Sequence, residues 1–293
     1  MKRCSSIGGS KRHQTKYGYQ SLNPYKNEIR LLKILPKHPD SGHRSRVKCS
    51  LFVASLDSTP EYQALSYSWS DPSERSIHGD ILLEGYHFQI TPNLENALFQ
   101  LRSDSVQIFW IDALCINQDN DGERSEQVSK MRVIYQRAEN VVVWLGSTSG
   151  SIPHAFSLFE MLYDIRLSKK FVAETLKDKT NSKGLQAITE LYKKPYWGRV
   201  WVIQEVHSAR KAIVMCGQYK IDWLKLDTVQ SCLRDEHDGA IIRLSSEEPT
   251  LNDLSTRIKF GGPKSMQIPR SATSSIPDID TLLSIFWMKV SLP

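Results

Sequence analysis

Two residues late in the chain, Trp201 and Glu205, have types and a spacing that suit a ligand-binding pair. Side chains four positions apart lie on one face of a helix, so both would stand on the same side of a helix over residues 199–209. An aromatic platform beside a carboxylate can hold a sugar-containing ligand and stabilise positive charge that develops on it. The same spacing also occurs in helices that bind nothing, in which case Trp201 fills the core and Glu205 pairs with Arg199 or Arg210 at the surface.

A second carboxylate, Asp112, stands where a short buried strand ends and a polar loop begins. Residues 108–111, Ile-Phe-Trp-Ile, are too few and too aromatic for a helix and are typical of a buried strand. Ligands of open α/β sheets bind beyond the carboxyl ends of the strands, which makes Asp112 a candidate to face a ligand. Polar residues of the same loop could bind ribose or phosphate oxygens, namely Asn117, Gln118 and Asp119. Alternatively, these side chains hold the loop through bonds to its backbone.

Other kinds of chemistry lack the residues that they require. Cys115 has no histidine near it in the sequence, and His207 stands alone on its helix, so no nucleophile–base pair emerges. Ser66 and Ser68 lie outside the G-x-S-x-G setting of a hydrolase nucleophile. No P-loop, G-x-G-x-x-G or H-E-x-x-H motif occurs, which speaks against a kinase, a nucleoside triphosphatase, a metalloprotease or a Rossmann-type dehydrogenase. We predict no metal site.

Apolar periodicity predicts the elements that position these residues. After the polar loop, apolar side chains recur at helical spacing, at Val128, Met131, Ile134, Tyr135 and Ala138. A second buried strand follows over residues 141–145 and ends at Gly146. Strand, loop, helix and strand together form one right-handed βαβ unit.

The chain on either side of this unit supplies further strands and helices. Residues 62–69 alternate and are rich in aromatic side chains, as expected for the first central strand. Glu84-Gly85 joins the two strands of a hairpin, and Thr91 with Pro92 begins a helix. Residues 167–183 are polar and rich in lysine, which indicates an exposed insertion. The remaining expected elements are strands over 28–35, 47–56 and 212–216 and helices from about 154 and over 185–192.

Three separated blocks of this chain strongly resemble the fungal heterokaryon incompatibility (HET) domain. They are Y-Q-A-L-S-Y-S-W-S-D at residues 62–71, W-I-D-A-L-C-I-N-Q at 110–118 with V-V-V-W-L-G at 141–146, and Y-W-G-R-V-W-V-I-Q-E-V-H-S-A at 196–209. The blocks occur in the order of the family and span residues 62–210. The family usually has glycine after the tryptophan of the first block, where this chain has Ser70. Glycine tolerates a positive φ more readily than serine does, so the resemblance does not fix the backbone conformation of this loop.

The resemblance implies a fold, because HET domains are distantly similar to Toll/interleukin-receptor (TIR) domains. We expect an α/β domain with a mainly parallel, flavodoxin-like sheet, flanked by helices and preceded by a small β lead-in. In catalytic TIR domains, the glutamate of W-x-x-x-E drives cleavage of NAD between nicotinamide and ribose, and Glu205 is the matching residue here. A carboxylate stabilises the oxocarbenium-like ribose, and nicotinamide leaves as a neutral group without a general acid.

The same resemblance implies the residues of the site. Glu205 is the expected catalytic carboxylate, and NAD is a possible substrate rather than a resident cofactor. The residues expected to bind the ligand are Trp201, Asp112, Tyr67 and Asn117. A competing interpretation is a non-catalytic signalling module that works by self-association or by contact with partner incompatibility proteins. Both interpretations describe a cell-death effector of fungal non-self recognition and innate immunity.

Charge and composition place the domain within the chain. Residues 1–48 hold 12 Lys and Arg against Glu28 and Asp40, whereas the remainder holds 26 basic and 30 acidic residues. The folded part is therefore mildly acidic, unlike a groove that binds nucleic acid. We divide the chain into a basic disordered leader over 1–26, a β lead-in over 27–61, the HET domain over 62–217, and a poorly defined segment over 218–293 that suggests a truncated C-terminus.

The five cysteines are scattered and form no C-x-x-C pair, which suits a reducing compartment. No apolar run is long enough to cross a bilayer, and the first residues lack the hydrophobic region of a secretory signal. These features predict a cytoplasmic protein.

Overall fold

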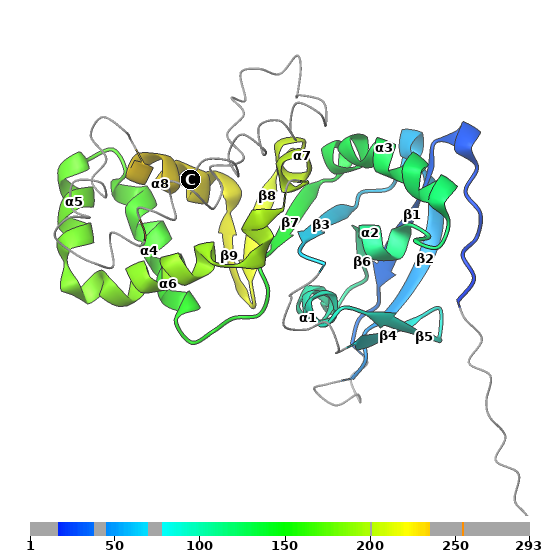
Figure 1. Ribbon diagram of the computed structural model, residues 1–293, viewed down its shortest axis with the longest axis horizontal. Coiled ribbons are helices and arrows are strands. Elements are labelled where there is room, and N and C mark those ends of the chain that lie inside the picture. The colour runs from blue at the N-terminus through cyan, green and yellow to red at the C-terminus, as the bar shows by residue number, and fades with distance from the viewer. Residues whose placement is uncertain (1–16, 38–44, 70–77, 200, 235–253, 255–293) are drawn as a thin grey trace, which may run out of the picture.

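The computed structural model describes residues 17–37, 45–69, 78–199, 201–234 and 254. One mixed sheet of nine strands forms its centre, with the order β5-β4-β2-β1-β6-β3-β7-β8-β9 (Figure 1). The strands are β1 Glu28–Ile34, β2 Lys48–Ser55, β3 Gln63–Tyr67, β4 Gly79–Leu83, β5 Tyr86–Ile90, β6 Gln107–Trp110, β7 Asn140–Trp144, β8 Ala212–Cys216 and β9 Tyr219–Asp222.

The predicted α/β class is confirmed, but the expectation of a mainly parallel sheet is wrong. Four adjacent strands, β6, β3, β7 and β8, run parallel, and β2 pairs with β4 in the same sense. The pairs β1–β2, β1–β6, β4–β5 and β8–β9 are antiparallel. Short connections favour antiparallel neighbours, and several of these strands follow one another directly in the chain. The strands predicted as a separate lead-in, β1 and β2, thus lie inside the same sheet.

The order of the four parallel strands has a consequence for ligand binding. The chain forms β3 first, places β6 on one side of it, and then crosses to place β7 and β8 on the other side. The strand order therefore reverses between β3 and β7, and this reversal is the topological switch point of the sheet. The carboxyl ends of β3, β6 and β7 meet at one edge, near Tyr67, Trp110 and Trp144.

Some helices cover the faces of the sheet, and others form a group beside its β9 edge. They are α1 Pro92–Leu101, α2 Asp112–Cys115, α3 Asp121–Arg137, α4 Ile152–Ile165, α5 Lys169–Lys177, α6 Ser182–Tyr192, α7 Val202–His207 and α8 Trp223–Arg234. Helices α3 and α7 pack together on one side of the sheet, with α1 on the other, while α4, α5, α6 and α8 form a group beside β9 (Figure 1).

Local chemistry explains where several of these helices begin. Thr91 accepts a hydrogen bond from the Leu94 N–H at 3.3 Å and Pro92 occupies the first turn, as the sequence predicted for α1. Ser168 caps α5 in the same way, and this helix buries Val172 and Leu176. The segment over residues 167–183 is exposed over most of its length, as predicted, and α5 is held to the fold by two apolar side chains one turn apart.

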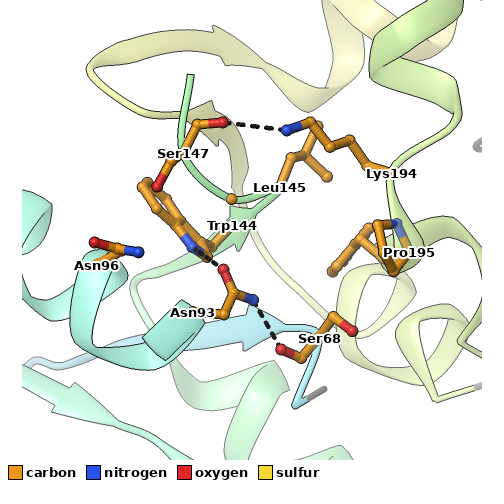
Figure 2. A pocket seen from close by; sticks show the side chains of 10 residues that line it. Ser68, Asn93, Asn96, Trp144, Leu145, Ser147, Lys194 and Pro195 are labelled. Atoms are coloured by element: carbon orange, nitrogen blue, oxygen red, sulfur yellow. Dashed lines mark hydrogen bonds between the residues drawn. The ribbon is translucent and has the colours of Figure 1, made fainter. Parts of the chain in front are cut away.

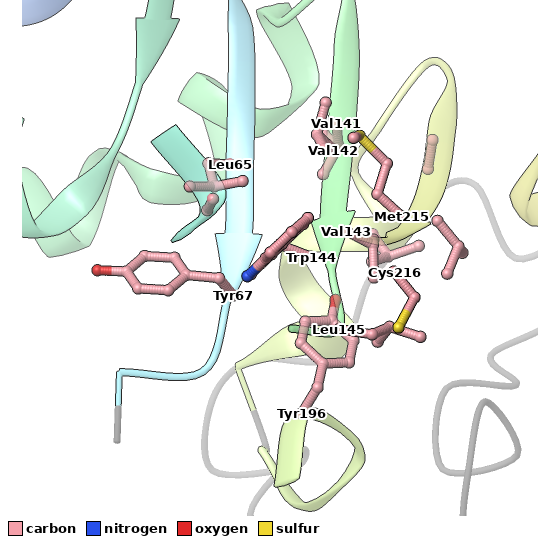
Figure 3. Packing of buried hydrophobic residues seen from close by; sticks show 14 of the residues in the cluster. Leu65, Tyr67, Val141, Val142, Val143, Trp144, Leu145, Tyr196, Met215 and Cys216 are labelled. Atoms are coloured by element: carbon pink, nitrogen blue, oxygen red, sulfur yellow. The ribbon is translucent and has the colours of Figure 1, made fainter. Parts of the chain in front are cut away.

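The core lies around the central parallel strands. Every residue from Val141 to Trp144 of β7 is buried, since helices or neighbouring elements cover both faces of this strand. Figure 3 shows these side chains with Leu65 of β3 and with Met215 and Cys216 of β8. This rigid centre holds the strand ends from which the candidate site is built.

Residues before and after the predicted HET segment also contact the sheet and its helices. In the segment assigned to the leader, the Tyr19 hydroxyl donates to the Leu114 carbonyl at 3.2 Å, and the guanidinium of Arg30 lies 4.9 Å from the Tyr19 ring. At the other end, β9 and α8 continue the fold past residue 217 and pack against β8 and α4. The predictions for residues 1–16, for Ser70 and for most of 235–293 fall outside the described residues.

Candidate functional site

Asp112 and Glu205 line one cavity of about 340 Å³, although 92 residues separate them in the chain. We call it the carboxylate cavity. Asp112 comes from the first turn of α2, directly after β6, and Glu205 comes from α7. The other lining residues are Trp69, Ile116, Gln118, Arg124, Val128, Met131, Arg199 and Trp201.

Asp112 is buried and its carboxylate is held from two sides. The Trp69 indole N–H donates to Oδ2 at 2.9 Å, and the Ala113 backbone N–H donates to Oδ1 at 2.7 Å. The pKa of Asp112 is raised to about 6, chiefly by burial and also by the negative charge of Glu205, while Arg199 and the two hydrogen bonds act in the opposite direction. Such a carboxyl group changes its charge close to neutral pH, which is the range that acid–base chemistry uses.

Glu205 is only 1% exposed and forms a bidentate ion pair. The Arg199 guanidinium donates to its two carboxylate oxygens at 3.1 and 3.3 Å, and the Ser66 hydroxyl also donates to Oε2. Because Ser66 donates to Glu205, the Tyr196 hydroxyl donates to Ser66, over 2.7 Å. The resulting chain runs from Tyr196 through Ser66 and Glu205 to Arg199.

The cavity brings together three of the five residues predicted for the site, namely Glu205, Trp201 and Asp112. Trp201 is 38% exposed, so it does not fill the core as the alternative interpretation expected. That interpretation did name the right partner for Glu205, but the Arg199–Glu205 pair is buried rather than at the surface.

Tyr67 and Asn117 do not belong to the cavity lining. Tyr67 is buried at the end of β3, where burial raises its pKa well above the usual value and the charge of Asp112 adds to the effect. Asn117 holds its own loop, because its Oδ1 accepts the Asp119 N–H at 3.2 Å. The neighbouring Gln118 lines the cavity instead and donates to the Asp112 carbonyl at 3.0 Å.

Sequence reasoning missed Trp69, Arg199 and Arg124 as cavity residues. Trp69 and Arg199 lie in the first and third blocks of the family resemblance, so the motif positions contained the information. Arg124 lies in the first turn of α3 and bonds Asp121 at 2.9 Å, and no motif pointed to it. Arg124 reaches the cavity because α3 packs against α7.

Two further kinds of chemistry can be judged from the described residues. Burial raises the pKa of the Cys115 thiol to about 12, so this group stays protonated and is a poor nucleophile. In the part of the chain that the structure describes, no group of three or more His, Cys, Asp or Glu side chains could hold a metal ion.

The fold and the site define an α/β domain that presents two buried carboxylates at the carboxyl edge of its parallel strands. The family model for the heterokaryon incompatibility protein (HET) matches residues 62–205, which include Trp69, Asp112, Arg199 and Glu205. Residues 62–205 of this chain are therefore a HET domain.

A curated relative supports this assignment. The chain is 29% identical over 267 residues to heterokaryon incompatibility protein 6, OR allele, of Neurospora crassa. The alignment covers 74% of this chain and 38% of the relative, so the chain spans well under half of that protein. No solved structure matches the chain significantly. Among the described residues, no helix has the length and apolar character needed to cross a membrane.

Proposed function

We propose that this chain is a cytoplasmic effector domain of fungal heterokaryon incompatibility, and that its carboxylate cavity cleaves NAD at the bond between nicotinamide and ribose. The family match and the name of the Neurospora relative support the biological role. The single observation that carries the chemical part is the meeting of Asp112 and Glu205 in one cavity beside two partly exposed tryptophans.

The cavity has properties that suit the nicotinamide riboside part of a dinucleotide. Its volume of about 340 Å³ lies within the range of small-molecule sites. Trp69 and Trp201, which are 40% and 38% exposed, offer aromatic faces to a planar ring. Arg124 and Arg199 can bind a diphosphate, and the carboxylates can accept the hydroxyl groups of a ribose. The strand order β6-β3-β7-β8 also agrees with the flavodoxin-like order of TIR domains.

The proposed reaction consumes NAD and water and yields nicotinamide, ADP-ribose and a proton. The glycosidic bond breaks, its electron pair passes to the pyridine nitrogen, and nicotinamide leaves as a neutral molecule. Glu205 stabilises the positive charge that develops on the ribose. Asp112, with a pKa of about 6, is largely ionised at pH 7 and accepts the proton of the attacking water.

The resting geometry implies a condition for activity. Both oxygens of Glu205 already accept hydrogen bonds from Arg199, and the positive guanidinium neutralises the carboxylate. Arg199 must therefore turn from Glu205 to the diphosphate of the bound substrate before the carboxylate can act. Such a change fits activation by assembly, in which a neighbouring copy or a partner incompatibility protein reshapes the loop that precedes α7.

Nicotinamide release by the oligomerised chain tests the proposal. We expect release from NAD by the wild type and a loss of at least about 100-fold in Glu205→Gln, which keeps the shape of the side chain but not its charge. Glu174→Gln is the matched control, because Glu174 lies on α5 and its side chain is 58% exposed. Release that continues unchanged in Glu205→Gln would exclude Glu205 as the catalytic carboxylate.

The engaged state of Glu205 also favours a second candidate function. A carboxylate that is 1% exposed and accepts hydrogen bonds at both oxygens has the features of a side chain that stabilises the fold. In that case, the domain is a non-catalytic module that signals by self-association. Absence of nicotinamide release under every assembly condition, together with cell death that persists in Glu205→Gln, would establish this alternative.

A further inference from the structure

A second cavity, of about 210 Å³, opens where β3 and β7 end, and we call it the switch-point cavity. The residues that line it include Gly146 and Tyr196, together with Ser68, Asn96, Ser147 and Lys194, and Figure 2 labels the last four. It shares no lining residue with the carboxylate cavity. The two cavities are nevertheless neighbours, because Ser68 lines one and the next residue, Trp69, lines the other.

The position of this cavity is the one where ligands bind in sheets of this topology. Strand order reverses between β3 and β7, and the crevice beyond the carboxyl ends at such a reversal is the usual ligand site. The carboxylate cavity lies beside this point, next to the ends of β6 and β3, and leaves the crevice between β3 and β7 unused. The switch-point cavity occupies that crevice.

Its walls are fixed by a hydrogen-bonded bridge. The buried Trp144 indole N–H donates to Asn93 Oδ1 at 2.9 Å, and Asn93 Nδ2 donates to the Ser68 carbonyl at 2.8 Å (Figure 2). Asn93 lies in the first turn of α1, so the bridge ties the start of this helix to the ends of β7 and β3. A cavity whose walls are held in this way is formed before any ligand arrives.

The charge around the cavity suits an anion. Lys194 reaches over it and donates to the Ser147 carbonyl at 3.1 Å, and no acidic side chain is among the described residues of the lining. The first turn of α1, a helix of ten residues, adds the positive end of its dipole. Gly146 has a φ of +101°, which side chains rarely adopt, and this turn places its backbone in the cavity wall beside Lys194.

We propose that the switch-point cavity binds a small phosphate monoester. Lys194 is the charged partner of the phosphate, while the Asn96 amide and the Ser147 hydroxyl supply further donors. The volume of about 210 Å³ is too small for a dinucleotide but has room for a phosphate with a few carbon atoms. This site does not depend on NAD cleavage in the carboxylate cavity, because the two sites use different residues.

Isothermal titration calorimetry with the full chain tests this assignment, with glycerol 3-phosphate as the ligand, inorganic phosphate as the minimal anion, and glycerol as the uncharged control. We expect the ester to bind more tightly than phosphate, and glycerol not to bind. Lys194→Gln should weaken binding of the ester at least tenfold, and Lys194→Arg should largely retain it. Lys193→Gln is the matched control, because Lys193 is exposed and lies outside the cavity lining.

Two further variants decide where the ligand lies. Asn96→Leu should weaken binding severalfold, and its exposed position makes it a safe change for folding. Asp112→Asn should leave binding of the ester unchanged, because Asp112 lies in the other cavity. No binding by the folded wild type, equal binding in Lys194→Gln and Asn96→Leu, or loss of binding in Asp112→Asn would each overturn the proposal. None of these outcomes bears on nicotinamide release, so the two proposals fail separately.

Discussion

Replacing Arg199 with methionine should destabilise the chain by about 3 kcal/mol at pH 7. Methionine keeps much of the aliphatic side chain but removes the guanidinium that bonds both oxygens of Glu205. Glu205 is 1% exposed, so water does not replace the lost donors, and Ser66 alone remains beside it. Breaking a buried ion pair typically costs about 3–5 kcal/mol. The 20% exposure of Arg199 places this pair at the lower end of that range.

Urea denaturation of a double-mutant cycle measures this effect. The free energy of unfolding is compared among the wild type, Arg199→Met, Glu205→Gln and the double variant, with tryptophan fluorescence and circular dichroism as probes. The double variant leaves no buried charge, so its loss should be smaller than the sum of the single losses by about 2 kcal/mol. Arg210→Met is the control, because Arg210 is exposed, and should change stability by less than about 0.5 kcal/mol.

The result that refutes this reasoning is specific. A loss below about 1 kcal/mol in Arg199→Met, or strict additivity of the two single changes, would mean that water reaches Glu205. Glu205 would then be a hydrated carboxylate that Arg199 does not hold inactive in the resting chain.

Three other changes test different parts of the structure. Burial raises the pKa of Asp112 from 3.8 to about 6, so its contribution to stability is full below pH 4 and is lost as the pH rises to about 6. The free energy of unfolding of Asp112→Asn, measured by urea denaturation, should therefore rise by about 2–3 kcal/mol relative to that of the wild type between pH 4 and pH 7.5. A difference between the two proteins that does not change with pH would contradict this. Arg30→Met should cost about 3–5 kcal/mol, because its 2.6 Å ion pair with Glu123 is buried. Arg46→Met, which breaks a largely exposed pair with Asp80, should cost less than about 1 kcal/mol in the same assay. In the native protein, Cys115 has a pKa of about 12 and should react with iodoacetamide at least about tenfold more slowly than the half-buried Cys232. Mass spectrometry measures both rates, and equal rates would indicate that α2 opens.

Local elements could be predicted from the sequence because their causes are local. Glu84 and Gly85 adopt φ values of +51° and +83°, and this turn joins β4 to β5 as the Glu-Gly pair indicated. Thr91 and Pro92 likewise begin α1 at the predicted residue. Strand order depends instead on contacts between distant segments. Nothing in the composition of β1 showed that it would pair with β6, and this pairing makes the sheet mixed.

The candidate site was predicted in part for the same physical reason. The rule that ligands gather at the carboxyl ends of strands, together with the family resemblance, brought Asp112 and Glu205 to one cavity. The direction of the Arg199 side chain follows from the turn at Pro195–Gly198 that precedes α7, and no periodic pattern describes such a turn. The hydrogen bond from the Trp69 indole to Asp112 joins segments that are distant in the sequence, and no local pattern predicts it.

The charges in the carboxylate cavity suit a ligand that carries a positive ring as well as negative groups. Asp112 and Glu205 bring two negative charges into a buried space, and the pKa of Asp112 shows that this arrangement opposes folding at neutral pH. Among the described residues, Arg199 is the cation that bonds directly to either carboxylate, while Arg124 pairs with Asp121 at the rim. The two carboxylates therefore exceed by one the cation that bonds to them, and Arg124 offsets this negative charge only from the rim. A ligand with a positive ring beside a ribose would offset that charge, and the charge that develops on the ribose as the bond breaks would be stabilised by the same two groups.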